Sequence, residues 1–214
     1  MRRLYFIYII YVLNVLKSKG VFSVLYNIVR GILTVFIKIC FRVEYVGREN
    51  IPENSGYIFC ANHITMLDPL LIACTGKTKF HFIAKEELCK IPVLGAILKR
   101  VNVIPVKRGS GDIGAMKKGI EVLKAGKNLI IFPEGTRSKT GEMGEAKNGM
   151  ALLIKKTGCG VVPCAVVGKP HFFKKTKLVY GKPVPAGYFE GEKELDIITD
   201  NIVFRIKDLL TKNK

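Results

Sequence analysis

Apolar positions divide the chain near residue 41. Two long apolar runs, Leu4–Leu16 and Val21–Phe41, come first, and beyond them the apolar residues fall into short runs separated by polar and glycine-containing stretches. Seven short runs are rich in β-branched and aromatic residues, which predicts strands. They are Arg42–Val46, Tyr57–Ala61, Phe80–Ala84, Asn102–Val106, Leu129–Phe132, Val161–Val167 and Lys177–Tyr180.

Helical periodicity occupies stretches between these strands. The expected helices are Pro69–Cys74, Val93–Lys99, Ile113–Lys124, Gly149–Lys156 and Lys193–Thr211. Alternation of strands and helices indicates an α/β fold, with a largely parallel central sheet and helices on both faces. We expect one such domain over residues 42–214. Ligands of such sheets bind beyond the carboxyl ends of the strands.

The first 41 residues have a different character. The run Leu4–Leu16 follows two arginines, as a signal peptide would, but no small-residue cleavage site comes after it. It is also shorter than the roughly 20 residues that a membrane-spanning helix needs. In Val21–Phe41 the polar residues keep to one helical stripe about 80° wide, which leaves a broad apolar face. These residues are Ser23, Asn27, Arg30, Thr34 and Lys38.

A helix with a narrow basic stripe suits the plane of the membrane interface. Inside a span, by contrast, Arg30 and Lys38 would be costly. We therefore predict that residues 1–41 form a membrane-associating two-helix hairpin that dips into one leaflet, so that the chain is monotopic or peripheral. Two true membrane spans and a soluble hairpin packed on the domain are the alternatives.

Net charge and cysteine content limit the classes of binding partner and the cellular compartment that we expect. A net charge of +18 favours a polyanionic partner, either nucleic acid or an anionic membrane. Many aromatic residues cluster in the N-terminal segment instead of alternating with basic residues, which argues against nucleic acid. The six cysteines include no CxxC and no zinc-ligand spacing. We expect free thiols, no metal site, and a location on the cytoplasmic face of the cell membrane.

The first candidate site follows the strand Tyr57–Ala61. His63 stands just past its carboxyl end, and Asp68 comes five residues later. On one continuous helix that spacing would hold the two side chains about 140° apart, but a turn over residues 64–67 would let Asp68 fold back onto His63. His63 would then be a general base that Asp68 orients. The alternative is a loop histidine beside an Asp that caps a helix beginning near Pro69.

Two further strand ends carry charged residues. Lys107 and Arg108 follow Asn102–Val106, where a solvated basic turn is the alternative. After Leu129–Phe132 come Glu134, Gly135, Thr136 and Arg137. Gly135 permits a tight turn with exposed N–H groups, and Arg137 fits a phosphate. We expect Glu134 to bond a substrate hydroxyl or to hold Arg137, while Lys139 and Lys147 add positive potential.

Two histidines and one proline complete the candidates. His81 lies in a predicted apolar strand, a position that favours a core histidine over a catalytic one. His171 lies in Lys169–Phe173, which we interpret as a surface or membrane-facing loop. Pro163 lacks an N–H, which predicts an edge strand or a bulge over Val161–Val167.

Together these stretches resemble the glycerolipid acyltransferases, most closely the bacterial lysophosphatidate acyltransferases. The resemblance covers residues 56–168 and rests on four motifs in family order. They are Asn62-His63 with Asp68, the stretch from Lys85-Glu86-Glu87-Leu88 to Val106-Lys107-Arg108, Phe132-Pro133-Glu134-Gly135-Thr136-Arg137-Ser138, and Val162-Pro163-Cys164-Ala165. The chain departs from the family at Ala146-Lys147-Asn148-Gly149 and at Val106-Lys107, which leaves the acceptor less certain than the reaction.

The resemblance implies an enzyme that acylates the sn-2 hydroxyl of 1-acyl-glycerol-3-phosphate. It makes His63 the general base and Asp68 its partner, with no cofactor and with acyl-CoA or acyl carrier protein as donor. It assigns substrate contacts to Lys107, Arg108, Glu134, Gly135, Thr136, Arg137 and Pro163. Alternatives are a different acceptor, such as glycerol-3-phosphate, another lysophospholipid or an ornithine- or sugar-lipid precursor, and a non-catalytic basic module that binds membranes or nucleic acid.

Overall fold

A seven-stranded sheet forms the centre of the protein. The computed structural model describes residues 28, 31–32, 34–35, 37, 39–54, 56–75, 79–91, 102–106 and 113–214. Across these residues the strand order is β1-β7-β6-β2-β5-β3-β4. Neighbouring strands run parallel except for β6 and β7, which are antiparallel. The strands are β1 (Arg42–Val46), β2 (Tyr57–Ala61), β3 (Phe80–Lys85), β4 (Val103–Val106), β5 (Asn128–Ile131), β6 (Gly160–Val167) and β7 (Lys175–Tyr180).

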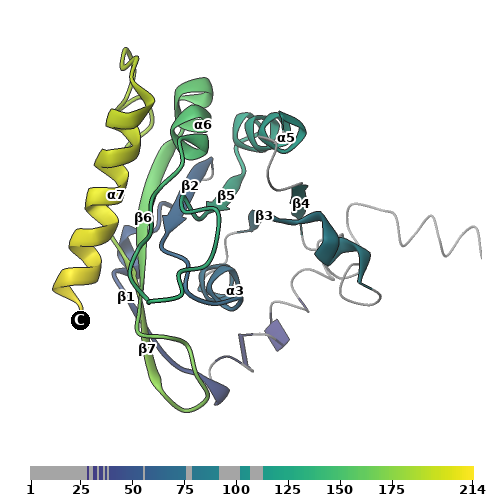
Figure 1. Ribbon diagram of the computed structural model, residues 1–214, viewed down its shortest axis with the longest axis vertical. Helices are drawn as coiled ribbons and strands as arrows, with labels where there is room; N and C mark the ends of the chain where they lie inside the picture. Colours follow the sequence, from purple (N-terminus) through teal and green to yellow (C-terminus); the bar gives the residue numbers. More distant parts are fainter. Residues whose placement is uncertain are drawn as a thin grey trace, which may run out of the picture.

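All seven predicted strands are present, with ends shifted by two residues at most. The described helices confirm the predicted order as well, and Figure 1 shows them around the sheet. The predicted helix Val93–Lys99 lies outside the described residues, as does the predicted run Leu4–Leu16. The helices are α3 (Asp68–Ala73), α5 (Ile113–Lys124), α6 (Gly149–Thr157) and α7 (Leu195–Lys212), with short 3-10 turns η1 (Arg48–Asn50) and η2 (Glu86–Lys90).

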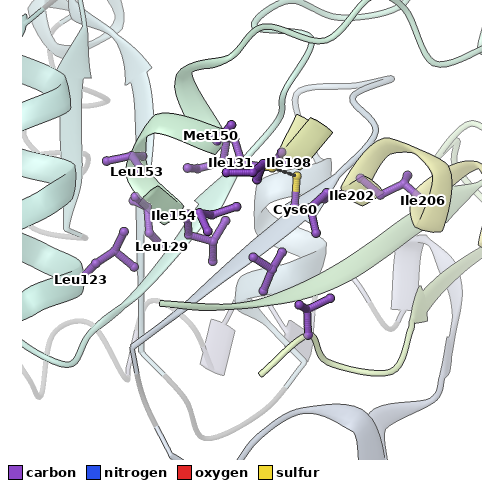
Figure 2. Close-up of a cluster of buried hydrophobic side chains, with 14 of the residues drawn as sticks. Cys60, Leu123, Leu129, Ile131, Met150, Leu153, Ile154, Ile198, Ile202 and Ile206 are labelled. Carbon is purple, nitrogen blue, oxygen red and sulfur yellow. Dashed lines mark hydrogen bonds between the residues drawn. The ribbon is translucent and has the colours of Figure 1, made fainter. Parts of the chain in front are cut away.

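Alternation along the strands separates the core into two layers. In β2, Ile58 and Cys60 face one side, which α5, α6 and α7 cover. Figure 2 shows this layer, where the Cys60 thiol donates to the Met150 sulfur at 3.0 Å. Phe59 and Ala61 face the other side, which α3 covers. The predicted α/β fold with helices on both faces is thus confirmed.

The long C-terminal helix shows how spacing selects the buried face. In α7, Ile198, Ile202 and Ile206 recur every four residues, and each is fully buried against the sheet. Side chains four apart share one helical face. The exposed side of α7 carries charged residues together with Ile197 and Phe204, so only the isoleucine face adds a ridge of apolar contacts to the first core layer.

The interior position of β6 contradicts the edge-strand prediction. It lies between β2 and β7, with Pro163 opposite Cys60 of β2 in an unbroken parallel register. On the other side, β7 pairs with β6 from Cys164 onward, and a separate bridge joins Val161 to Val184. Pro163 falls between these two pairings, where its carbonyl still accepts the Gly181 N–H at 2.8 Å. The missing N–H therefore faces a gap in the antiparallel ladder.

Residues just before β1 pack on the sheet from the α3 side. The described positions of the predicted helix Val21–Phe41, from residue 28 to residue 40, are helical. Ile37 is buried in the second core layer, and Phe41 is also buried. Among the residues that the structure describes, no helix is long and apolar enough to cross a membrane. The two-helix hairpin as a whole remains a prediction.

Candidate active site

The turn after β2 brings the predicted pair together. Residues Ile64–Leu67 leave the strand direction, and Asp68 begins α3. His63 Nδ1 lies 2.9 Å from Asp68 Oδ2. Among the described hydrogen bonds, those of the Asp68 carboxylate all go to residues of the preceding turn or to His63. The contact favours the catalytic interpretation over the capping one.

Hydrogen bonds from the turn hold the Asp68 carboxylate in place. It is fully buried, and its Oδ2 accepts the N–H groups of Ile64 at 2.6 Å and Thr65 at 2.7 Å. The Thr65 hydroxyl donates to Oδ1 at 2.7 Å. Since these partners are donors, Asp68 acts as an acceptor, and the remaining contact is a donation from His63 Nδ1–H. The Nε2 lone pair of His63 is then available to take a proton.

Phe132 packs on the imidazole of His63, and Asn62 holds the end of the strand that carries it. The ring stacks on Phe132, with centroids 4.1 Å apart and an interplanar angle of 20°. Its side chain keeps 14% exposure, enough for a substrate to reach it. The adjacent Asn62 is buried and bonds Val166 twice, donating to its carbonyl at 3.0 Å and accepting its N–H at 2.8 Å. This link ties the ends of β2 and β6 together.

Glu134 braces the loop of His63 from the next strand end. It is buried, and its Oε1 accepts the His63 backbone N–H at 2.8 Å. Its Oε2 accepts the Gly144 N–H, also at 2.8 Å. The sequence led us to expect a bond to a substrate hydroxyl or to Arg137. Instead both carboxylate oxygens hold backbone N–H groups, and among the described ion pairs none joins Glu134 to Arg137.

The loop after β5, residues 132–138, which we call the third-motif loop, lies directly beside His63. The Ser138 N–H donates to the His63 carbonyl at 2.7 Å, which places Arg137 one residue from that contact. Thr136 and Arg137 are both exposed. The loop therefore offers a guanidinium and a hydroxyl to solvent at the edge of the sheet where His63 lies.

A second cation covers the turn at Gly135. That residue has φ +65°, a left-handed conformation in which glycine is unstrained. A Cβ built on Gly135 would lie 3.9 Å from Lys147 Nζ. The Lys147 N–H also donates to the Pro133 carbonyl at 2.9 Å, so the backbone brings this lysine against the turn. The exposed turn and the ammonium together suit an anionic group.

The structure gathers some predicted site residues and not others. His63, Asp68, Glu134, Gly135, Thr136 and Arg137 come from two adjoining loops at the carboxyl ends of β2 and β5. Pro163 lies inside β6, where its contact with Gly181 is on the side of β7. Lys107 and Arg108 lie outside the described residues, which reach Val106 at the end of β4. Their roles remain predictions.

Sequence reasoning missed Thr65 as a part of this site and gave no role to Asn62 and Phe132, which it quoted only as members of motifs. Thr65 stands three residues before Asp68, a spacing typical of a hydroxyl that caps a turn. For Phe132 and Asn62 no local signal exists, because their partners come from other strands. His81 lies near the amino end of β3, opposite Leu129, and so at the edge away from His63. This position agrees with a structural histidine.

The nearest thiol is poorly suited to nucleophilic catalysis. Cys60 lies in β2 just before the site and is fully buried. Burial raises the pKa of this thiol well above its usual range, and nearby Glu134 raises it further. A protonated thiol is a weak nucleophile. The arrangement thus supports proton removal from a substrate hydroxyl by His63 instead of attack by the protein.

Comparisons with known proteins agree with this geometry. Residues 42–167 match the family model described as Acyltransferase. A 1-acyl-sn-glycerol-3-phosphate acyltransferase of Borreliella burgdorferi is 32% identical over 182 residues, which cover 78% of this chain and 73% of that protein. A protein of the same name from Bacillus subtilis is 28% identical and covers 88% of this chain and 98% of its own length.

One solved structure extends the similarity to three dimensions. The crystal structure of the 1-acyl-sn-glycerophosphate acyltransferase PlsC from Thermotoga maritima matches with a TM-score of 0.70 and 31% sequence identity. The match covers 88% of this chain and 82% of that one. The similarity therefore extends to the α/β fold with its mostly parallel central sheet.

Proposed function

The chain belongs to the acyltransferase family, and on that premise we propose that it acylates the free sn-2 hydroxyl of 1-acyl-glycerol-3-phosphate. The product is phosphatidate, a precursor in phospholipid biosynthesis. Relatives named for this reaction match most of the chain. The observation that carries the proposal is the 2.9 Å contact between His63 Nδ1 and Asp68, in a turn bonded to the loop of Arg137.

The chemistry begins with proton transfer to the histidine. His63 Nε2 takes the proton of the substrate hydroxyl while the hydroxyl oxygen attacks the carbonyl carbon of the acyl thioester. The imidazolium that forms is stabilised by Asp68. When the carbon–sulfur bond breaks, the thiolate leaves and takes the proton from His63. General-base catalysis of this kind contributes ~10²–10⁴-fold to the rate.

We assign phosphate binding to the third-motif loop, residues 132–138. The exposed Arg137 guanidinium can form a two-pronged contact with phosphate oxygens, and Lys147 adds an ammonium beside Gly135. Arg108 and Lys107 are proposed as further cations that reach the same group. Holding the phosphate fixes the distance between the hydroxyl and His63, which supplies the orientation part of catalysis.

The proposed acyl donor is a thioester, either acyl-CoA or acyl carrier protein, and the reaction needs no further cofactor. A thioester fits the mechanism because thiolate is a good leaving group. The deciding assay is acyl transfer to lysophosphatidate with each donor in parallel. A panel of glycerol-3-phosphate, other lysophospholipids and ornithine- or sugar-lipid precursors then tests the acceptor.

Two substitutions test the assigned roles. His63→Ala should remove most of kcat, whereas Asp200→Ala, at an exposed position on α7, should leave it unchanged. Arg137→Ala should chiefly raise KM for lysophosphatidate, while Arg205→Ala on α7 should not. Near-normal turnover by the His63 variant would exclude the base assignment, whereas an absence of acyl transfer by the wild-type protein would favour a non-catalytic basic module.

Membrane association completes the proposed function. We propose that residues 1–41 hold the enzyme on the cytoplasmic face of the membrane without crossing it. On the described part of the second helix, Ile28, Ile32, Val35 and Ile39 form an exposed apolar stripe at helical spacing, each between 52% and 67% exposed. Burial of each such side chain contributes about 1.5–3 kcal/mol, against ~1 kcal/mol for a lysine near anionic lipid. High salt should therefore leave the enzyme on membranes, and detergent should release it.

A further inference from the structure

The connection between β6 and β7 emerges from the same edge of the sheet as His63. It comprises residues 168–174, which we call the β6–β7 loop. Asn62, next to His63, bonds both backbone groups of Val166 near the end of β6. In Figure 1 this hairpin forms the lowest part of the ribbon, at the end away from α5 and α6. The loop therefore lies beyond the carboxyl ends of the strands, as the site does.

Two contacts join the β6–β7 loop to the end of the helix that precedes β1. The Phe173 N–H donates to the Cys40 carbonyl at 3.0 Å, and the Phe172 ring stacks on buried Phe41 with centroids 4.8 Å apart. Cys40 directly follows Ile39, the last member of the exposed apolar stripe. The loop therefore adjoins the end of the stripe.

Exposed aromatic and basic side chains make up this loop. Phe172 is 51% exposed and Phe173 is 71% exposed. Lys169, Lys174 and Lys175 are exposed on either side of them. Apolar rings that enter lipid, flanked by ammonium groups that meet anionic headgroups, are the composition that an interfacial membrane contact needs.

The backbone of Phe173 holds its ring away from the protein in a strained conformation. Phe173 has φ +62°, a left-handed conformation that is rare for a bulky residue. Such strain persists where the surrounding structure enforces it, often at functional positions. Here the bond to Cys40 keeps the strained residue in place while its ring stays in solvent, so the strain is unrelated to core packing.

We propose that the β6–β7 loop inserts Phe172 and Phe173 into an anionic lipid bilayer and is a second membrane contact besides the N-terminal helices. This rests on the proposed membrane function. Two contacts on one edge of the sheet fix the tilt of the domain, so that the His63 side faces the leaflet that holds the lysolipid. An acidic carrier protein would also suit the lysines, but the continuity of Phe172 and Phe173 with the apolar stripe favours lipid.

Fluorescence provides a direct test because the chain contains no tryptophan. Phe173→Trp in the full-length protein places the sole indole at the loop tip. Phosphatidylglycerol-containing vesicles should shift its emission to the blue, and lipids brominated in the acyl chain should quench it. Phe204→Trp, at an equally exposed position on α7, should show neither effect. Unshifted Phe173→Trp emission while the protein co-sediments with the vesicles would overturn the proposal and leave the enzymatic function intact.

A second variant separates lipid contact from folding. Phe173→Asn fits the left-handed backbone better than phenylalanine does, so it should not lower the melting temperature. It should weaken binding to anionic vesicles about tenfold or more, the loss expected for one buried ring, whereas Phe204→Asn should not weaken it. Turnover of a water-soluble short-chain lysophosphatidate should stay unchanged. Unchanged vesicle binding, or a blue shift caused only by acyl carrier protein, would reject the lipid contact.

Discussion

At the residue scale, the buried carboxylate of Glu134 has the most specific structural assignment. Its two oxygens accept backbone N–H groups on opposite sides, from His63 and from Gly144. We propose that a carboxylate used in this way positions His63 instead of touching substrate. The resemblance to known acyltransferases implied a substrate contact, so the two roles give different kinetic expectations.

Glu134→Gln separates the two roles. The amide offers a donor where the carboxylate offered an acceptor, so one buried N–H, of His63 or of Gly144, loses its partner. A lost buried partner costs about 1–3 kcal/mol of stability. We expect kcat to fall more than tenfold with little change in KM for lysophosphatidate. A raised KM with normal kcat would instead support substrate binding, and exposed Glu145→Gln is the matched control.

Gly135→Ala tests the turn under Lys147. The left-handed backbone at this position disfavours any side chain by roughly 1–2 kcal/mol, and the new methyl group would contact the lysine. We expect a higher KM for lysophosphatidate. Gly191→Ala carries the same backbone cost at φ +86° with no atom within 4 Å, and it should lower the melting temperature without changing KM.

At the element scale, two asparagines secure opposite ends of β2. Asn62 links the carboxyl end to Val166 of β6. Asn128 accepts the N–H groups of Gly56 and Tyr57 at the amino end, both at 2.9 Å. Both side chains are buried, and each makes two bonds to backbone. The strand thus has one such link beside the site and one remote from it.

Asn62→Ala and Asn128→Ala therefore form a matched pair. Each leaves buried backbone groups without partners, so each should lower the free energy of unfolding by ~2 kcal/mol or more in urea titrations. Only Asn62→Ala should also reduce kcat, because His63 follows it directly. Equal losses of kcat in both variants would mean that general destabilisation explains the effect.

Local sequence patterns account for the elements better than for the links between them. The strand Tyr57–Ala61 depends on neighbouring residues and was predicted, and the turn before Asp68 was considered as the condition for its contact with His63. The bonds from Asn62 to Val166 span 104 positions, and that from Glu134 to His63 spans 71. Such pairs depend on strand order, which a single sequence does not reveal. The edge-strand prediction from Pro163 failed for the same reason, since the pairing partners on one side of this interior strand change at that residue.

At the scale of the whole molecule, a histidine away from the site couples stability to pH. Burial lowers the pKa of His81 below 6.5, and Lys127 lowers it further. The unfolded chain therefore takes up a proton, as pH falls below about 6.5, that the folded protein resists. The part of the unfolding free energy that depends on a neutral His81 is fully present above about pH 6.5. It is lost as pH falls through the pKa of His81 in the folded protein.

His81→Leu should flatten that dependence. Between about pH 7.5 and 5.5, the unfolding free energy of the wild-type protein should fall relative to the variant. Because the ring is only partly buried and solvent screens its charge, we expect a difference under about 1 kcal/mol. His171→Leu changes an exposed histidine and should keep the wild-type slope. Parallel curves for wild type and His81→Leu would refute the coupling.

The pairing of the first strand with the last has a consequence for biosynthesis. β1 is an edge strand whose pairing partner is β7, and Asn50 just beyond it donates to the Tyr180 carbonyl, 130 positions away. Contacts of such sequence separation form late. While the ribosome is still making the intervening chain, residues 1–41 have no sheet to dock on. If residues 1–41 bind the membrane as proposed, the nascent segment would meet the lipid surface before the catalytic domain folds.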